Sequence, residues 1–152
     1  MSMPERNFSL DLVRMTEAAA LASARWLGKG NTDAGDGAAV DAMRISLNNL
    51  NIQGRIVIGE GEKDNAPMLY NGEEVGIGSG PALDIAIDPV EGTKLLAYGR
   101  PNAISVVGAA PKGAMFDPGP SFYMEKLVVP PEARNAADLD APVQDNLRNI
   151  AR

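Results

Sequence analysis

The sequence predicts an α/β layered domain in which a mixed sheet is flanked by helices. Three observations predict this class. The chain has 152 residues, which is about the size of one ordinary domain. Its content of 45% hydrophobic and 22% charged residues is typical of a globular protein that buries a core. Segments with helical periodicity alternate with short apolar runs bounded by glycine and proline, and this alternation indicates helices layered on a sheet.

Two helices are expected first. Ser9 is a suitable N-cap for a helix that continues to Leu27 and ends at residues 28–30, where two glycines flank a lysine. After a polar loop at residues 31–37, apolar residues at helical spacing predict a second helix over residues 37–50. Asp36 directly precedes this helix, and a helix N-cap is the ordinary structural role for an aspartate there.

Four strands are expected next. Apolar runs predict them at residues 55–58, 83–87 and 103–110, and residues 122–129 form a fourth candidate. One helical turn is expected at residues 94–98. Prolines then indicate a linker, after which a last helix begins at Val143.

Composition and charge restrict the chemistry. The chain has no histidine and no cysteine, which excludes imidazole bases, thiol catalysis, disulfides and typical zinc sites. Any metal must be bound by oxygen, which favours Mg²⁺ or Mn²⁺. A net charge of −6 argues against nucleic-acid binding. The N-terminus is polar and no apolar run reaches the ~18 residues of a membrane span, so we expect a cytoplasmic protein with no membrane association.

The most informative segment is the run from Asp84 to Thr93, which reads Asp-Ile-Ala-Ile-Asp-Pro-Val-Glu-Gly-Thr. It is predicted to be a buried strand that ends on Asp88, with Asp84 on the same face, followed by a turn at the proline. Glu91 adds a second carboxylate, and two carboxylates on a turn suit a hard divalent cation. The Gly-Thr step offers backbone N–H groups and a hydroxyl to an anion. A metal site beside an anion site indicates phosphate chemistry.

A further acidic group, Glu60-Gly-Glu62, follows the strand predicted at residues 55–58. A solvated turn is its ordinary explanation. Glycines on both sides of Glu60, however, let another backbone or a ligand come close, which a plain turn does not require. Glu60 is therefore a candidate ligand, and Asp36 is another.

Residues 88–93 resemble the Asp-Pro-[Ile/Leu]-Asp-Gly-[Thr/Ser] signature of the metal-dependent, lithium-sensitive sugar and inositol phosphatases. With glutamate in the fourth position, and with the sequence around it, the chain resembles the class II fructose-1,6-bisphosphatases. The segments that carry this resemblance run nearly from end to end and are Thr16–Leu21, Trp26–Gly28, Asp36–Val40, Ala42–Arg44, Ile56–Glu62, Ala66–Tyr70, Asp84–Thr93, Asn102–Ala103, Tyr123–Lys126 and Asp145–Asn149.

The resemblance implies a sugar-phosphatase-like fold and a set of metal ligands. Asp36, Glu60, Asp88 and Glu91 fall on the family's ligand positions, for Mn²⁺ or Mg²⁺. Asp36 or Glu60 would also accept the proton of the attacking water.

The resemblance likewise implies a substrate site. Glu91, Gly92 and Thr93 fall on a stretch that contacts the substrate phosphate, and Tyr123 falls on a further substrate contact. Thr93 falls where these phosphatases use a threonine hydroxyl to orient the attacking water.

The activity implied by the resemblance is hydrolysis of the 1-phosphate of a small sugar bisphosphate, fructose 1,6-bisphosphate, to give fructose 6-phosphate in gluconeogenesis. The family is roughly twice as long as this chain, whose sequence stops at Arg152 within the last predicted helix. We therefore expect residues 1–152 to be the N-terminal metal- and phosphate-binding half of such an enzyme, without the C-terminal half, and to form a homo-oligomer. The alternative is a catalytically inactive truncated remnant, or an assembly or regulatory subunit, that retains the fold.

Overall fold

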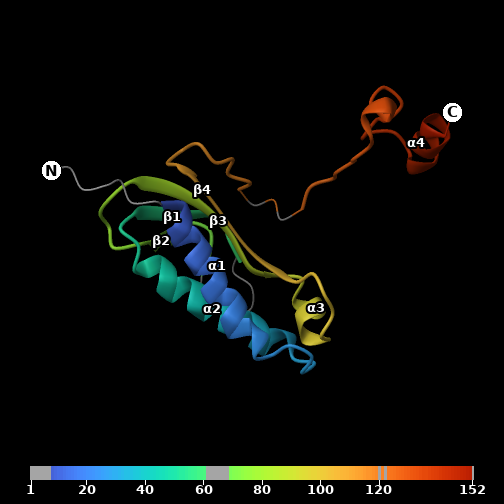
Figure 1. Cartoon of the computed structure of the whole chain (residues 1–152). Coiled ribbons are helices and arrows are strands. Elements are labelled where there is room, and N and C mark those ends of the chain that lie inside the picture. The colour runs from blue at the N-terminus through green and yellow to red at the C-terminus, as the bar shows by residue number, and fades with distance from the viewer. Residues whose placement is uncertain (1–7, 61–68, 120, 122, 152) are drawn as a thin grey trace. The chain divides into compact units, whose positions relative to one another are not determined.

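The structure is a computed structural model that describes residues 8–60, 69–119, 121 and 123–151 (Figure 1). The chain divides into two compact units, Met1–Asp117 and Pro118–Arg152. The first unit holds two long helices, the sheet and one short helix, and the second holds a 3-10 turn and a final helix. The expected α/β class, with helices and a mixed sheet, is confirmed.

The two long helices are α1, Phe8–Ala24, and α2, Thr32–Asn48. The side chain of Asn31 caps α2 by accepting a hydrogen bond of 3.0 Å from the N–H of Ala34. The predicted loop at residues 31–37 was therefore wrong, as was the N-cap role of Asp36, which lies inside the helix. The helix begins earlier because Asn31 is itself a strong cap.

The glycines near the start of α2 favour a loop in the sequence, but one of them is required for close packing of the helix. A Cβ on Gly35 would lie 2.8 Å from Cδ2 of Leu96 and 3.4 Å from Cβ of Trp26. Gly35 thus allows α2 to approach the turn after α1 and the short helix that follows the sheet's third strand. Close packing, and not backbone flexibility, explains a glycine at this position.

The sheet has four strands in the order β2-β1-β3-β4. The first two are β1, Gln53–Ile58, and β2, Glu74–Val75, which pair antiparallel. The third, β3, Ala82–Glu91, is parallel to β1 and antiparallel to β4, Ile104–Pro111. The two-residue β2 was not predicted from the sequence, since its pairing to β1 depends on a contact distant along the chain.

The third strand differs from its prediction in where it ends. β3 does not stop at Asp88 but continues to Glu91, which pairs with Ile104. The pairing register shifts between Asp88 and Glu91, and Pro89 lies in this irregular part. A proline has no N–H for the ladder and is tolerated where the ladder is interrupted. The proline therefore marks a bulge, and the chain turns only at Gly92.

The strand predicted at residues 122–129 is wrong over residues 123–129, which are not in a strand. Residue 122 lies outside the described residues. A strand needs a neighbour for its N–H and C=O groups. In the described part of the second unit, no strand offers that pairing. The unit instead contains η1, Pro131–Ala133, and α4, Val143–Ile150, which begins where the sequence predicts.

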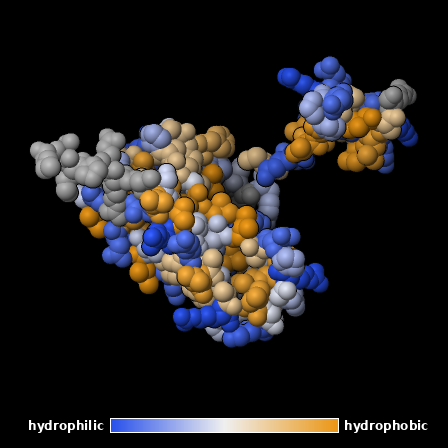
Figure 2. Space-filling model, in the orientation of Figure 1, coloured by the Kyte–Doolittle hydropathy of each residue, from blue (hydrophilic) through white to orange (hydrophobic). Residues whose placement is uncertain are grey.

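Helices α1 and α2 lie side by side over one face of the sheet (Figure 1). Met15 of α1 and Met43 of α2 are fully buried, as is Ile85 of β3. Apolar side chains also reach the surface of the face that α1 and α2 form (Figure 2). None of the helices in the described residues is long and apolar enough to cross a membrane.

Residues of β3 alternate between the two faces of the sheet. Ile85 and Ile87 belong to the core that the helices cover. Asp84 and Asp88 therefore share the opposite face, as the sequence predicts. This alternation turns Asp84 and Asp88 to the face of the sheet opposite the one that carries Ile85 and Ile87.

Candidate functional site

Three acidic side chains share one electrostatic environment at the end of β3. The pKa of Asp88 is raised from its ordinary value of 3.8 to about 6, and burial of the carboxyl is the largest cause. A hydrogen bond with the Glu91 side chain, the charge of Glu91 and the charge of Asp36 contribute to the same rise in pKa. The N–H of Val90 acts in the opposite direction. The structure therefore brings Asp36 and Glu91 close enough to Asp88 for their charges to act on its carboxyl.

Glu60 reaches the same edge of the sheet from the neighbouring strand. Ile58 at the end of β1 pairs with Ala86 of the parallel strand β3. The carboxyl ends of parallel strands meet at one edge of a sheet. Glu60, just after β1, therefore lies at the same edge as Asp88 near the end of β3. Its carboxylate is not among the groups that shift the pKa of Asp88.

The backbone around Glu60 is held by a close approach of another segment. The N–H of Glu60 donates to the carbonyl oxygen of Leu69 at 3.1 Å. A Cβ on Gly59 would lie only 2.1 Å from that same oxygen. The interpretation that a glycine beside Glu60 lets another backbone come close is confirmed for Gly59. The glycine at position 61 and Glu62 lie outside the described residues.

An ion pair between Arg44 and the buried Glu73 holds the segment that contacts Glu60. Glu73 is 7% exposed, and its Oε1 accepts from Nε of Arg44 at 3.1 Å. Its Oε2 accepts from the N–H of Tyr70 at 3.3 Å, next to Leu69. Sequence reasoning missed this pair, because Arg44 and Glu73 are 29 residues apart along the chain and no local pattern links them. The only signal in the sequence was a charged residue, Glu73, in a predicted loop, and nothing local shows that it is buried.

The donors in this group fit a hard cation in chemistry. Every side chain is a carboxylate, the ligand type that Mg²⁺ and Mn²⁺ favour. Among residues 8–60, 69–119, 121 and 123–151, however, no three acidic side chains are close enough to form a ready-made metal site. Carboxylates repel one another. The acidic residues are gathered at one edge of the sheet without being closed around a centre.

The chain turns directly after Glu91. Gly92 has a φ of 90°, in the left-handed region that favours glycine. Its carbonyl oxygen accepts hydrogen bonds from the N–H groups of Leu95 at 2.8 Å and Leu96 at 3.2 Å. Thr93 is the first residue of the short helix α3, Thr93–Ala97, so the predicted helical turn is confirmed to within one residue. Thr93 and the carboxylate of Glu91 are thus held on either side of one tight turn.

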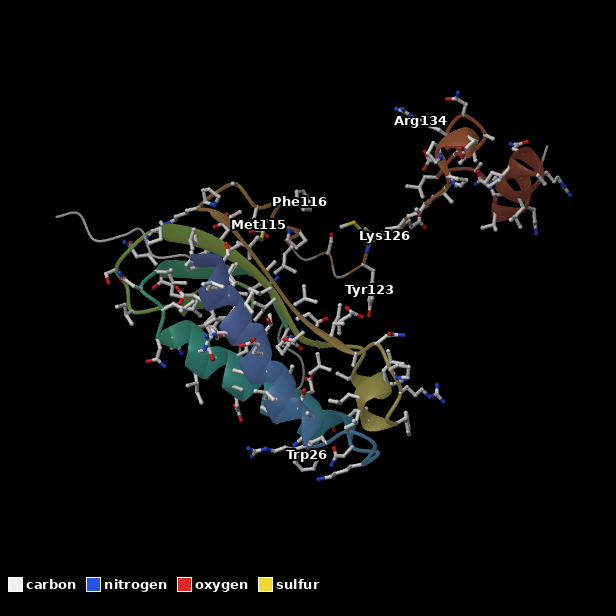
Figure 3. All side chains as sticks on the ribbon, in the orientation of Figure 1. Trp26, Met115, Phe116, Tyr123, Lys126 and Arg134 are labelled. Carbon is white, nitrogen blue, oxygen red and sulfur yellow. The ribbon has the colours of Figure 1, made fainter. Side chains whose placement is uncertain are left out.

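Tyr123 belongs to the second unit, in which its side chain is 96% exposed (Figure 3). Its role as a substrate contact stays a prediction.

Asp84 has a role that the sequence did not reveal. Its side chain is buried, and Oδ2 accepts from the N–H of Gly113 at 2.7 Å and from the N–H of Met115 at 3.2 Å. These bonds hold the segment after β4, which carries Met115 and Phe116 (Figure 3). The only signal in the sequence was an aspartate within an apolar strand, which does not identify a partner.

Comparison with known proteins agrees with the resemblance seen in the sequence. The family model described as "Bacterial fructose-1,6-bisphosphatase, glpX-encoded" matches residues 6–152. The chain is 54% identical over 146 residues to "Fructose-1,6-bisphosphatase 1 class 2" of Escherichia coli (strain K12). It has the same identity to "Fructose-1,6-bisphosphatase class 2" of Escherichia coli O6:H1 (strain CFT073) and of Shigella flexneri.

These matches cover 96% of this chain but 43% of each relative, so the chain spans less than half the length of the curated relatives it matches. The matched residues include every acidic residue of the candidate site. The chain therefore belongs to the family of bacterial class II fructose-1,6-bisphosphatases.

Proposed function

We propose that this chain is the N-terminal, metal- and phosphate-binding part of a phosphatase that removes the 1-phosphate of fructose 1,6-bisphosphate. The observation that carries this proposal is the acidic group at the end of β3. Asp88, Glu91 and Asp36 are close enough to raise the pKa of Asp88, and the Gly-Thr turn follows at once. Neighbouring carboxylates repel one another, and a divalent cation offsets that repulsion.

We assign Asp36, Glu60, Asp88 and Glu91 as the residues that hold the cation. When bound, Mn²⁺ or Mg²⁺ neutralises charge on phosphate oxygens and lowers the pKa of a coordinated water. Asp36 lies on α2, Asp88 and Glu91 lie on β3, and Glu60 lies two residues after the end of β1. Carboxylates on separate elements can close around a cation through side-chain rotation alone.

Thr93 orients the attacking water in this proposal. Its hydroxyl is too weak a base to deprotonate water alone, so it passes the proton to a carboxylate, a role that we assign to Asp36 or Glu60. The N–H groups of Gly92 and Thr93 bind phosphate oxygens together with the turn at Glu91. Such N–H groups at the start of a helical turn have no partner within the helix. Tyr123 is a further proposed substrate contact.

The experiment is release of phosphate from fructose 1,6-bisphosphate with Mn²⁺ or Mg²⁺, comparing the natural chain with Thr93→Ala and Thr93→Ser. We expect Thr93→Ala to lower the rate by about 100-fold or more, within the range for loss of a proton-transfer group. Thr93→Ser keeps the hydroxyl and should retain most of the rate. Unchanged Mn²⁺ affinity in both variants would show that the loss is in the reaction and not in metal binding. Full activity in Thr93→Ala would remove Thr93 from the mechanism.

The alternative is an inactive chain that retains the fold as an assembly or regulatory subunit. One observation favours it: the described residues contain no ready-made cluster of three acidic side chains. The same assay separates the two functions. Mn²⁺ binding without any phosphate release would support the alternative, whereas phosphate release that requires the metal would exclude it.

We also propose that the protein is a cytoplasmic, homo-oligomeric enzyme of gluconeogenesis. Exposed apolar side chains on one helix support the self-association. Leu10, Val13 and Leu21 of α1 are 60%, 48% and 73% exposed. A single monomeric species in sedimentation velocity, at all concentrations measured, would contradict it.

A further inference from the structure

The segment at residues 69–73 supports the backbone of Glu60. The N–H of Ile56, in β1, donates to the carbonyl oxygen of Glu73 at 2.9 Å. Just after β1, the N–H of Glu60 donates to the carbonyl oxygen of Leu69 at 3.1 Å. The two ends of the segment are thus bonded to the strand and to the residue that follows it. The backbone of Glu60 therefore depends on this segment for its position.

Leu69 has an unfavourable backbone conformation within the segment. Its φ is 56°, in the left-handed region where residues other than glycine are uncommon. Its side chain is fully buried in the core. A residue keeps such a conformation only when the surrounding contacts impose it, and strained positions of this kind cluster at functional sites. The carbonyl oxygen that Glu60 binds is therefore held in place by contacts of the rest of the segment.

The carboxylate of Glu73 makes the charged contacts of the segment. Its Oε2 accepts from the N–H of Tyr70 at 3.3 Å. Its Oε1 accepts from Nε of Arg44 at 3.1 Å and lies 3.1 Å from Nη2 of the same guanidinium. Burial of a carboxylate is costly unless a partner charge offsets it. Arg44 supplies that charge, and its planar group meets the carboxylate through two nitrogens at once.

Arg44 lies on α2, the helix that also carries Asp36. The helix therefore holds one candidate ligand, Asp36, on its own backbone. Through the ion pair it also anchors the segment that supports a second candidate ligand, Glu60. The two ligands are separated along the chain but depend on the same helix.

We infer that Arg44 is a positioning residue for the divalent cation, which acts through Glu73 and the backbone of Leu69 on Glu60. A guanidinium has no acceptor atom, so Arg44 is not itself a ligand. This role rests on the proposed function, because it takes Glu60 as a ligand. Its sign differs from that of a charge effect. Removal of a cationic side chain favours Mn²⁺ binding by Coulomb's law, whereas loss of positioning weakens it.

The first measurement is amide hydrogen exchange in the metal-free protein, which requires neither metal binding nor turnover. Arg44→Met removes the guanidinium and keeps a long side chain that suits a helix. We expect exchange at the amide of Glu60 to become about tenfold faster than any change at Ile85 of β3, whose amide reports on the core. Arg14→Met removes an exposed arginine of α1 and should change neither rate. An unchanged rate at Glu60 in folded Arg44→Met would overturn the inference.

The second measurement is the affinity for Mn²⁺, with free and bound Mn²⁺ distinguished by electron paramagnetic resonance. Arg44→Met should weaken binding by about tenfold, as for other residues that orient metal ligands. Glu60→Gln should also weaken it. In the Glu60→Gln background Arg44→Met should have little further effect, because residues that act through one ligand are not additive.

The four proteins of this cycle also separate the two proposals. Equal losses from Arg44→Met in both backgrounds would overturn the role of Arg44. So would a loss in Glu60→Gln without a loss in Arg44→Met, and the ligand assignment would then stand. No Mn²⁺ binding at all, or an unchanged affinity in Glu60→Gln, would overturn the ligand assignment and the role of Arg44 together.

The double variant Arg44→Met/Glu73→Leu separates positioning from stability. It removes both charges, so the net charge is unchanged and no carboxylate stays buried without its partner. Apolar replacement of a buried ion pair is often neutral or stabilising. The bond to the N–H of Tyr70 is still lost, so we expect a melting temperature near the natural value but Mn²⁺ affinity about tenfold below it. Recovery of both quantities would show that the pair serves stability alone and would overturn the inference.

Discussion

Asp84 and Asp88 are the same residue type on the same face of the same strand, and the structure gives them opposite surroundings. Asp84 is buried against two backbone N–H groups, which donate to one of its oxygens. Asp88 is partly buried beside other carboxylates, and burial first, then the hydrogen bond and charge of Glu91 and the charge of Asp36, raise its pKa to about 6. A buried carboxylate with donors stabilises the fold, whereas one among like charges gains from a proton or a cation. The surroundings of an aspartate, more than its position in a strand, indicate its role.

The largest effect is expected when the satisfied carboxylate is removed. Asp84→Ala leaves the N–H groups of Gly113 and Met115 without their acceptor and should lower the free energy of unfolding by about 3 kcal/mol, the scale of hydrogen bonds to a charged group. Urea unfolding of the metal-free protein measures it. In the matched variant Asp88→Ala the free energy of unfolding should fall much less, because the natural carboxylate at this position is held among repelling charges. Equal losses in the two variants would contradict the comparison.

The next effect tests whether Glu60 belongs with Asp88. In Gly59→Ala the new methyl group would collide with the carbonyl oxygen of Leu69, which the N–H of Glu60 binds. We expect a loss of about 1–3 kcal/mol in the free energy of unfolding, as for other overpacked sites. Mn²⁺ affinity, measured by titration, should fall as Glu60 moves.

The control for this variant is Gly37→Ala in α2. A Cβ there would meet nothing within 4 Å, and the position is helical. Alanine should therefore stabilise the helix by about 0.5–1 kcal/mol. If Gly59→Ala retains both natural stability and natural Mn²⁺ affinity, the close approach at Glu60 does not matter to the site.

A smaller effect is expected when Asp88 is neutralised without a change in shape. Asp88→Asn keeps the size of the side chain but removes the charge, and should weaken Mn²⁺ binding by about tenfold or more, in line with the strength of a charged ligand over a neutral one. Asp41→Asn, on an exposed position of α2, is the control and should leave the titration unchanged. Superimposable titrations of Asp88→Asn and the natural protein would remove Asp88 from the ligands.

Local patterns in the sequence predicted most of the first unit. Helical spacing identified both long helices, and apolar runs identified β1, β3 and β4. The start of α2 was missed because a glycine at position 35 suggests a loop. The glycine is there because Leu96 packs so closely that a side chain would not fit. The partner of Asp84 was missed for a related reason: its acceptor role depends on backbone 29 and 31 residues further along the chain.

The candidate site also has a part that local patterns predicted and a part that they missed. Motif and resemblance supplied its residues, and the structure brings Asp36, Asp88 and Glu91 into one electrostatic environment. The ion pair of Arg44 and Glu73, which fixes the segment beside Glu60, has no local pattern. Long-range contacts that position a site follow from the fold as a whole and not from any window of the sequence.

The smallest effect, and the one that separates the two aspartates most directly, is in the dependence of stability on pH. The pKa of Asp88 is raised from 3.8 in an unfolded chain to about 6 in the metal-free fold, so between these values the folded state binds the extra proton. Stability must then fall as pH rises from 3.8 to about 6, and the cost is fully present above that value. Asp88→Asn has no carboxyl to ionise and does not incur this cost. The melting temperature of the natural protein should therefore drop relative to that of the variant as pH rises across this window. Mn²⁺ competes with the same proton, so its affinity for the natural protein should weaken as pH falls through about 6. Parallel melting curves of the two proteins across the window would show that Asp88 is as well satisfied as Asp84.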